Sequence, residues 1–106
     1  MEIKLYQHKD GRVPFDIWLA NIKDIRARAK ILIRFDRILL SNFGDSKSVG
    51  QGVSELRINE GKGYRVYYGC KGKEIVLLFC GSDKATQQTD IQLAKIYWRK
   101  YGEQCS

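Results

Sequence analysis

The fold of this chain is decided by residues 53–83, which read VSELRINEGKGYRVYYGCKGKEIVLLFCGSD. Runs rich in valine, isoleucine, leucine and tyrosine alternate here with two glycine-containing hinges, at residues 59–63 and 71–73. Apolar runs separated by such hinges are typical of β-hairpins. The stretch therefore predicts three consecutive antiparallel strands joined by two tight turns.

The first hinge also predicts which residues face each other across the first hairpin. A turn about Gly61 gives five facing pairs: Ile58–Tyr64, Arg57–Arg65, Leu56–Val66, Glu55–Tyr67 and Ser54–Tyr68. Because successive side chains of a strand point to opposite faces, the apolar residues share one face and the two arginines share the other with Glu55 and Tyr67. Like charges facing each other are unfavourable by roughly a few tenths of a kcal/mol, so the sheet does not need Arg57 and Arg65 for its own stability.

Two explanations of the arginine pair remain open at this point. An anionic ligand would resolve the repulsion, because two guanidinium groups one strand apart can hold phosphate oxygens bidentately. Alternatively, Glu55, Glu60 or Asp83 neutralises the arginines, and the pair is part of a solvated network.

Composition narrows the classes of function. A chain of 106 residues forms one domain, here taken as residues 1–106. Its 19 basic and 12 acidic residues leave a formal charge of +7, which favours polyanionic partners. Because no long apolar segment or signal sequence is present, we expect a soluble, cytoplasmic protein with no membrane partner.

The three cysteines predict neither a disulfide framework nor a metal site. Cys70, Cys80 and Cys105 are odd in number and lack metal-ligand spacing, so we expect reduced thiols and no cofactor. A turn at residues 72–73 would set Cys70 opposite Ile75 and Cys80 opposite Arg65.

Helices are predicted on both sides of the hairpins. Residues 1–7 alternate apolar Ile3 and Leu5 with polar neighbours and Tyr6, as in a half-buried strand. A short helix follows from Pro14 to about residue 22, and Asp24 caps a longer one that ends near residue 41. In that longer helix, the predicted core-facing stripe consists of Ile25, Ala29, Leu32, Phe35 and Leu39.

The chain ends in a further helix. Thr89 and Gln92 suggest a capping box, and the helix continues to about residue 101. Its apolar stripe comprises Ile91, Ala94, Trp98 and Tyr101. The order β-α-α-β-β-β-α predicts a small α+β fold in which helices pack on an antiparallel sheet.

A ridge of basic residues is predicted on the outer side of the longer helix. It consists of Arg26, Lys30, Arg34 and Arg37. Such a ridge is either a solvated helix face or a surface that docks on a phosphate backbone.

Several blocks of the sequence, in order, resemble a known family. They are VPFDIWL, FGDSKSVGQGVSELRI, GYRVYY, IVLLFCGSDKATQQTDI and AKIYW, and they extend from about residue 13 to residue 98. The pattern is similar to the addiction-module killer proteins of the RelE/HigB-like group, within the RelE/ParE superfamily of bacterial toxins. The resemblance implies a type II toxin that cleaves mRNA at the ribosome and inhibits translation, encoded beside a HigA-like helix-turn-helix antitoxin.

The resemblance also implies a set of site residues. Metal-free RNA cleavage needs a group that accepts the 2′-hydroxyl proton, groups that stabilise charge on the phosphoryl oxygens and a proton donor for the leaving 5′-oxygen. With His8 as its single histidine, the chain cannot use a histidine pair. The family works instead with lysine, arginine and tyrosine, and the matching positions here are Arg57, Arg65 and Lys84. Two further candidates come from the residues themselves, namely Lys62, which is clustered among these cations, and Tyr67, which is predicted on the arginine face.

Within that set, the resemblance makes Arg57 and Arg65 the phosphate-holding pair. Lys62 or Lys84 is the candidate base, with Asp83 orienting Lys84, and Tyr67 stacks on a base or protonates the leaving group. The product would carry a 2′,3′-cyclic phosphate.

Two other functions fit the same resemblance. The ParE branch of the superfamily inhibits DNA gyrase by protein binding, and an RNA-binding module without activity would share the basic surface.

Overall fold

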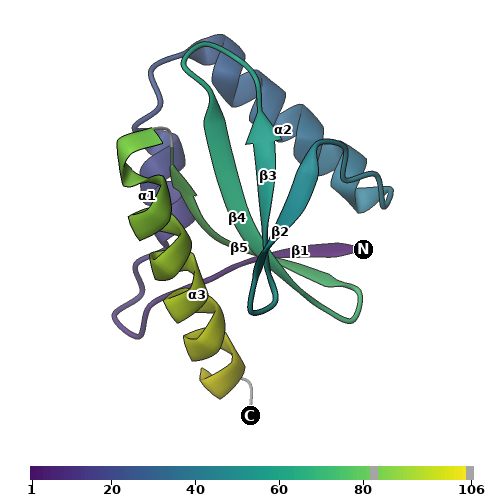
Figure 1. The fold of residues 1–106 in the computed structure, drawn as a ribbon. Helices are drawn as coiled ribbons and strands as arrows, with labels where there is room; N and C mark the ends of the chain where they lie inside the picture. Colours follow the sequence, from purple (N-terminus) through teal and green to yellow (C-terminus); the bar gives the residue numbers. More distant parts are fainter. Residues whose placement is uncertain (82–83, 105–106) are drawn as a thin grey trace.

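The computed structural model describes residues 1–81 and 84–104, which form one five-stranded sheet with helices on both faces (Figure 1). In chain order the elements are β1 (Glu2–Leu5), α1 (Pro14–Ala20), α2 (Ile25–Leu39), β2 (Ser46–Gly50), β3 (Val53–Ile58), β4 (Tyr64–Lys71), β5 (Glu74–Gly81), the 3₁₀ helix η1 (Lys84–Thr86) and α3 (Gln87–Gln104). The predicted α+β class is confirmed. One element, β2, was not predicted.

The sheet has the strand order β1-β5-β4-β3-β2. The hairpins β3–β4 and β4–β5 are antiparallel, as predicted, and β2 adds to β3 in the same sense. β1 pairs with β5 in parallel, so the sheet is mixed. A parallel neighbour is possible here because α1, α2 and three strands separate β1 from β5 in the chain.

Each face of the sheet has its own core. On one face, Leu56 and Val66 pack with Ile31 of α2 and with Phe15 of α1, and all four are buried. On the other face, α3 contributes Ile91, Ala94 and Tyr101. Figure 1 shows α2 and α3 on opposite sides of the strands.

The helix boundaries follow from their caps. Pro14 occupies the first turn of α1, as predicted. The Asp24 carboxylate accepts the backbone N–H groups of Arg26 and Ala27, which confirms the predicted cap of α2. The capping box at Thr89 is wrong, because α3 begins at Gln87 and Thr89 lies within it.

The predicted core stripe of α2 is wrong except at Phe35, which is partly buried and packs against the core. The buried residues of the helix are Ala27, Ile31 and Ile38, whereas Ile25 and Leu32 point into solvent. The helix carries two apolar stripes, and the sheet packs on the one that the periodicity argument did not select.

Two details of the strands differ from expectation. In β1 the alternation places Leu5 at the surface, and the next residue, Tyr6, is buried. In the second hairpin, Cys70 faces Ile75 as predicted, but Cys80 faces Val66 rather than Arg65, because a bulge shifts the register between Tyr67 and Tyr68.

Cys80 is buried in the core beneath α1 and α2, Cys70 is exposed, and both are free thiols. The predicted third thiol, Cys105, lies outside the described residues. Among the described residues, no helix combines the length and apolar character needed to cross a membrane.

Candidate functional site

The first hairpin has the register that the sequence predicts. All five pairs are confirmed, and Arg57 faces Arg65 across β3 and β4. Both arginine side chains are partly exposed, while Leu56 and Val66, which point to the other face, are fully buried. The hairpin therefore holds two guanidinium groups on one side of the sheet, near the turn.

Four of the five predicted catalytic residues line one open hollow of about 390 Å³. Its residues come from the ends of β3 and β4, the turn between them and η1, and they are Arg57, Ile58, Asn59, Gly61, Lys62, Gly63, Tyr64, Arg65 and Lys84. Its described lining holds four cations and no carboxylate, so this hollow is suited to an anion. We call it the basic hollow.

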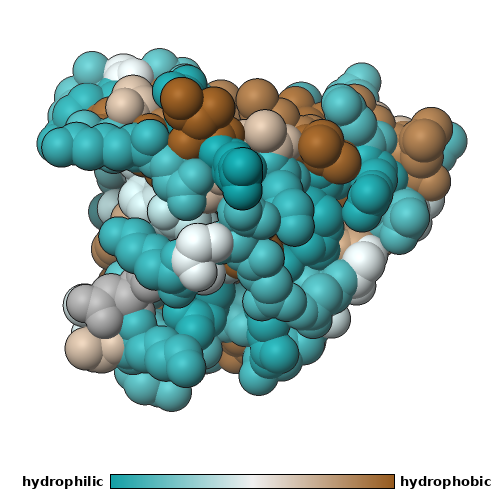
Figure 2. Space-filling model, turned by 90° about the horizontal axis from the view of Figure 1, so that it is seen from above, coloured by the Kyte–Doolittle hydropathy of each residue, from teal (hydrophilic) through white to brown (hydrophobic). Residues whose placement is uncertain are grey.

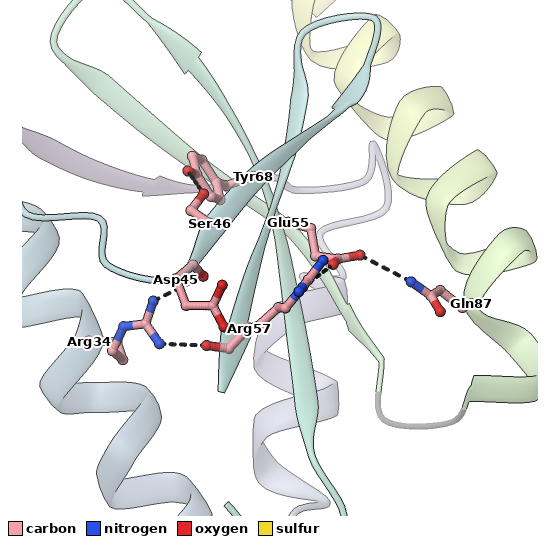
Figure 3. A network of polar contacts seen from close by, with 7 residues as sticks. All are labelled: Arg34, Asp45, Ser46, Glu55, Arg57, Tyr68 and Gln87. Atoms are coloured by element: carbon pink, nitrogen blue, oxygen red, sulfur yellow. Dashed lines mark hydrogen bonds and ion pairs between the residues drawn. The ribbon is translucent and has the colours of Figure 1, made fainter. Parts of the chain in front are cut away.

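A buried carboxylate fixes one of the two arginines. Glu55 is 0% exposed, and its Oε1 accepts a hydrogen bond from Arg57 Nε at 3.0 Å (Figure 3). Its Oε2 accepts from Gln87 Nε2 at 3.4 Å, so the start of α3 closes over it. The hydrogen bond to Glu55 raises the pKa of Arg57 further, and the guanidinium stays charged.

The two arginines are therefore not equivalent. Glu55 neutralises Arg57, which was one of the two explanations that the sequence left open. Arg65 has no carboxylate within ion-pair distance among residues 1–81 and 84–104. Asp83, which we expected to orient Lys84, lies outside the described residues. The hollow thus presents one anchored and one uncompensated guanidinium group.

Tyr67 lies on the arginine face, as predicted, but it does not reach the basic hollow. Its side chain is fully buried under α3, and its hydroxyl has no hydrogen-bond partner in the described structure. Burial raises the pKa of Tyr67, and the negative charges of Glu55 and Asp90 add to the effect. In this position the ring cannot stack on an RNA base.

The basic ridge of α2 is divided between structural and exposed residues. The Arg34 guanidinium donates to the backbone carbonyls of Arg57 and Asp45 (Figure 3). It also donates to the backbone carbonyl of Phe43. Desolvation lowers the pKa of Arg34. Since its fork is occupied by three carbonyls, Arg34 holds β3 to α2 rather than projecting toward a ligand.

The other ridge residues remain at the surface. Lys30 forms an ion pair with Glu60 at 3.0 Å, and Arg26 and Arg37 are exposed. A second hollow of about 290 Å³ is lined by Lys30, Ile33, Arg34, Arg37, Asp45, Arg57, Ile58 and Asn59. Because it shares Arg57 with the basic hollow, a cationic surface runs from η1 across the hairpin to α2.

Two residues of the site were not found from the sequence. The predicted start of the last helix at Thr89 leaves Gln87 outside that helix, so the sequence does not predict its hydrogen bond to Glu55. Asp45 precedes β2, which was missed. The sequence contained one relevant signal. Glu55 lies two residues from Arg57 and therefore on the same side of the strand, where it can pair with that arginine.

His8, the single histidine, lies away from the basic hollow. His8 packs against the rings of Tyr6 and Tyr97 and lines a separate hollow. Within the described ranges, no three His, Cys, Asp or Glu side chains are grouped so that they could hold a metal ion.

Comparison with known proteins gives two matches. An uncharacterized protein of Haemophilus influenzae is 50% identical over 88 residues, which is 83% of this chain and 89% of the relative. Residues 21–99, which include α2 and every residue of the basic hollow, match the family described as phage derived protein Gp49-like (DUF891). The chain belongs to this Gp49-like family.

Proposed function

We propose that this protein is a toxin of a type II toxin–antitoxin system, related to the RelE/HigB group, and that it cleaves mRNA without a metal ion. The observation that carries the proposal is the basic hollow, where Arg57, Arg65, Lys62 and Lys84 meet in one anion-sized space. Membership of the Gp49-like family and the formal charge of +7 are consistent with it.

The arginine pair would bind the phosphate at which the chain is cut. During cleavage the RNA 2′-hydroxyl loses its proton, its oxygen attacks the adjacent phosphorus, and the bond from phosphorus to the 5′-oxygen breaks. The phosphoryl oxygens gain negative charge in the transition state, and preorganised guanidinium groups stabilise it. Arg57 supplies a fixed donor because Glu55 anchors its Nε, and Arg65 supplies the uncompensated charge.

The two lysines of the basic hollow are the proposed proton-transfer groups. Lys62 lies in the β3–β4 turn and Lys84 at the start of η1, on different elements around the basic hollow. We assign the acceptor of the 2′-hydroxyl proton to one lysine amine and the donor for the 5′-oxygen to the other lysine. The products are a 2′,3′-cyclic phosphate and a 5′-hydroxyl. Tyr67 is left out because it is buried away from the hollow.

The second hollow extends this site along the RNA. We expect Arg37, and Lys30 on release from its ion pair with Glu60, to contact flanking phosphates, which makes binding depend on salt. In the proposed system the message is cut in the cytoplasm, at the ribosome, and translation stops. A HigA-like helix-turn-helix antitoxin from the neighbouring gene suppresses the activity.

Primer extension on cellular mRNA after brief induction tests the proposal. New 5′ ends should appear with the wild type and be absent with Arg65→Ala. Arg99→Ala is the matched control, because Arg99 is exposed on α3 and lines neither hollow. It should cleave like the wild type.

Two results would replace the proposal. Growth arrest with DNA breaks and intact mRNA would favour a ParE-like inhibitor of DNA gyrase. RNA binding with neither cleavage nor growth arrest would leave an RNA-binding module.

A further inference from the structure

The outer face of α2 carries an apolar stripe that nothing in the described chain covers. Ile25 is 80% exposed, Leu32 51% and Leu39 43%, although the same helix buries Ala27 and Ile31 on its inner face. Large aliphatic side chains repeatedly exposed on one helix face usually mark a site of interaction. Figure 2 shows hydrophobic residues at the surface, interrupted by hydrophilic ones, when the molecule is seen from above.

The exposed residues follow the spacing of a coiled-coil seam. Ile25, Leu32 and Leu39 recur every seven residues, and the exposed Ala29 and Asp36 occupy the positions between them. A 3-4 spacing keeps such residues in a single row along a helix, which is the row that a second helix packs against. We call these five residues the α2 seam.

The α2 seam is widened at one end by further apolar residues. Ile33 is half-exposed and Leu40 strongly exposed, and both follow seam residues directly in the chain. The other end is bordered by charge, because Arg26 and Arg28 lie on either side of the first turn and are exposed. A partner helix therefore meets arginines near the start of α2 and then apolar side chains that only Asp36 interrupts.

We propose that the α2 seam is the docking site for an amphipathic helix of a partner protein that carries acidic residues beside its apolar row. Charge complementarity decides the partner. α2 exposes Arg26, Arg28 and Arg37 against the single acid Asp36, and the whole chain has a net charge of +7. The other two basic residues of the helix do not count here, because Lys30 pairs with Glu60 and Arg34 binds backbone carbonyls. Glutamates flanking the partner's apolar row would face Arg26 and Arg28.

A second copy of the chain fits this surface less well. An antiparallel pair of α2 helices would bring Arg28 of one copy near Asp36 of the other. It would also bring together two surfaces that each carry exposed Arg26 and Arg37, with no acid left to neutralise them. Like charges beside a seam disfavour pairing.

The site is separate from the basic hollow, since no residue of the α2 seam lines it. Binding at the seam requires no RNA cleavage, so a failed docking test and a failed cleavage test are distinct results. Within the proposed function, the antitoxin would be the protein that carries the acidic helix.

The test uses two synthetic helical peptides of three heptads, both with leucine in the a and d positions. One has glutamate in all e and g positions and the other has lysine. Binding to the full-length protein is measured by fluorescence anisotropy at low and high salt. We expect the glutamate peptide to bind about tenfold more tightly than the lysine peptide, with a smaller difference at high salt.

Substitutions in the α2 seam test whether the peptide binds there and not elsewhere on the protein surface. Two separate variants, Leu32→Asp and Leu39→Asp, should each weaken binding of the glutamate peptide by about tenfold or more. Neither should change the melting temperature, because both side chains are partly exposed. Ile96→Asp, at an exposed apolar position on α3, is the control and should bind like the wild type.

Three results would overturn the inference. They are equal affinity for the two peptides, no binding of the glutamate peptide to the wild type, and unchanged binding by both seam variants. Sedimentation of the protein alone provides a further check. A dimer that Leu32→Asp dissociates would assign the α2 seam to a second copy of the chain instead.

Discussion

Replacing Tyr67 by phenylalanine removes a hydroxyl that the fold buries without a partner. The ring lies between the sheet and α3, and its oxygen makes no hydrogen bond in the described structure. A buried, unsatisfied polar group costs about 1–3 kcal/mol relative to water. We therefore expect Tyr67→Phe to raise the free energy of unfolding by about 1–3 kcal/mol, less a small loss for the void that the oxygen leaves.

Thermal and urea denaturation measure this effect. For a domain of this size, each kcal/mol moves the melting temperature by about 4–8 °C. The substitution should also leave mRNA cleavage unchanged, since Tyr67 does not line the basic hollow. Tyr68→Phe is a useful contrast, because the Tyr68 hydroxyl shares a hydrogen bond with Ser46. That variant should lose stability.

The pH dependence gives an independent check. Burial raises the pKa of Tyr67 above its ordinary value of 10.0. Below pH 10 the hydroxyl is neutral in both the folded and the unfolded chain, so its titration does not affect stability. Above pH 10 the unfolded chain ionises first, and the free energy of unfolding of the wild type falls as the pH rises. Because phenylalanine does not ionise, the advantage of Tyr67→Phe over the wild type should widen above pH 10.

Two outcomes would refute this reasoning. A loss of more than about 1 kcal/mol in Tyr67→Phe would mean that the hydroxyl has a partner in solution. Lost cleavage at unchanged or increased stability would return Tyr67 to the catalytic set, as a proton donor that reaches the hollow after a movement of α3.

Three further expectations follow from the site and its support. Lys62→Ala and Lys84→Ala should both lose cleavage of ordinary RNA. On RNA whose scissile 5′-oxygen is replaced by sulfur, single-turnover assays should show cleavage only by the variant that lacks the proton donor. Equal behaviour of both variants on both substrates would contradict the assignment. Arg34→Lys keeps the charge but loses the guanidinium group that binds three carbonyls, so urea unfolding should show a free energy of unfolding that is lower by about 2 kcal/mol. An unchanged free energy of unfolding would mean that only the charge of Arg34 matters. In Gly69→Ala the new Cβ would overlap Trp98 Cε3, at a cost of about 1–3 kcal/mol. Trp98→Leu should restore most of this stability, whereas strictly additive losses would show that the clash is not the cause.

The register of the first hairpin could be predicted because two local features agree on it. The hinge at Gly61 fixes which residues face each other, and the alternation in β3 and β4 fixes which side chains share a face. A slip of one residue in one strand would have moved its apolar side chains to the face that carries the arginines. The positions of Arg57 and Arg65 on one face follow from these features, and the basic hollow follows from those positions together with the turn.

For the hairpin β4–β5 and the edge strand β2, turn position and apolar alternation do not together fix the register. β5 reads EIVLLFCG, and Val76, Leu77 and Leu78 are all buried, so a bulge moves no polar residue to the wrong face. Without alternation, the sequence gives no sign of the shift that brings Val66 opposite Cys80. β2 reads SKSVG with one apolar residue, and it pairs with β3 through backbone groups that any sequence can supply.

Arg34 illustrates a different kind of error. Helical spacing places it correctly among Arg26, Lys30 and Arg37, but spacing does not reveal what the side chain reaches. Its three acceptors belong to the loop before β2 and to β3, segments that lie far away in the sequence. A long basic side chain at the border of a buried face can project outward or fold back, and only the tertiary neighbours decide between the two.

The misassigned stripe of α2 has a physical cause that bears on function. Two apolar rows run along this helix, one through Ala27, Ile31 and Ile38 and the other through Ile25 and Leu32. A helix that only covers a sheet needs one such row, and polar residues on its outer face would favour solubility. Exposed aliphatic residues increase the risk of aggregation, so a second row is best explained by a partner that covers it. The same arginines that border this row disfavour self-association, which leaves an acidic helix as the partner that satisfies both the apolar row and its charged border.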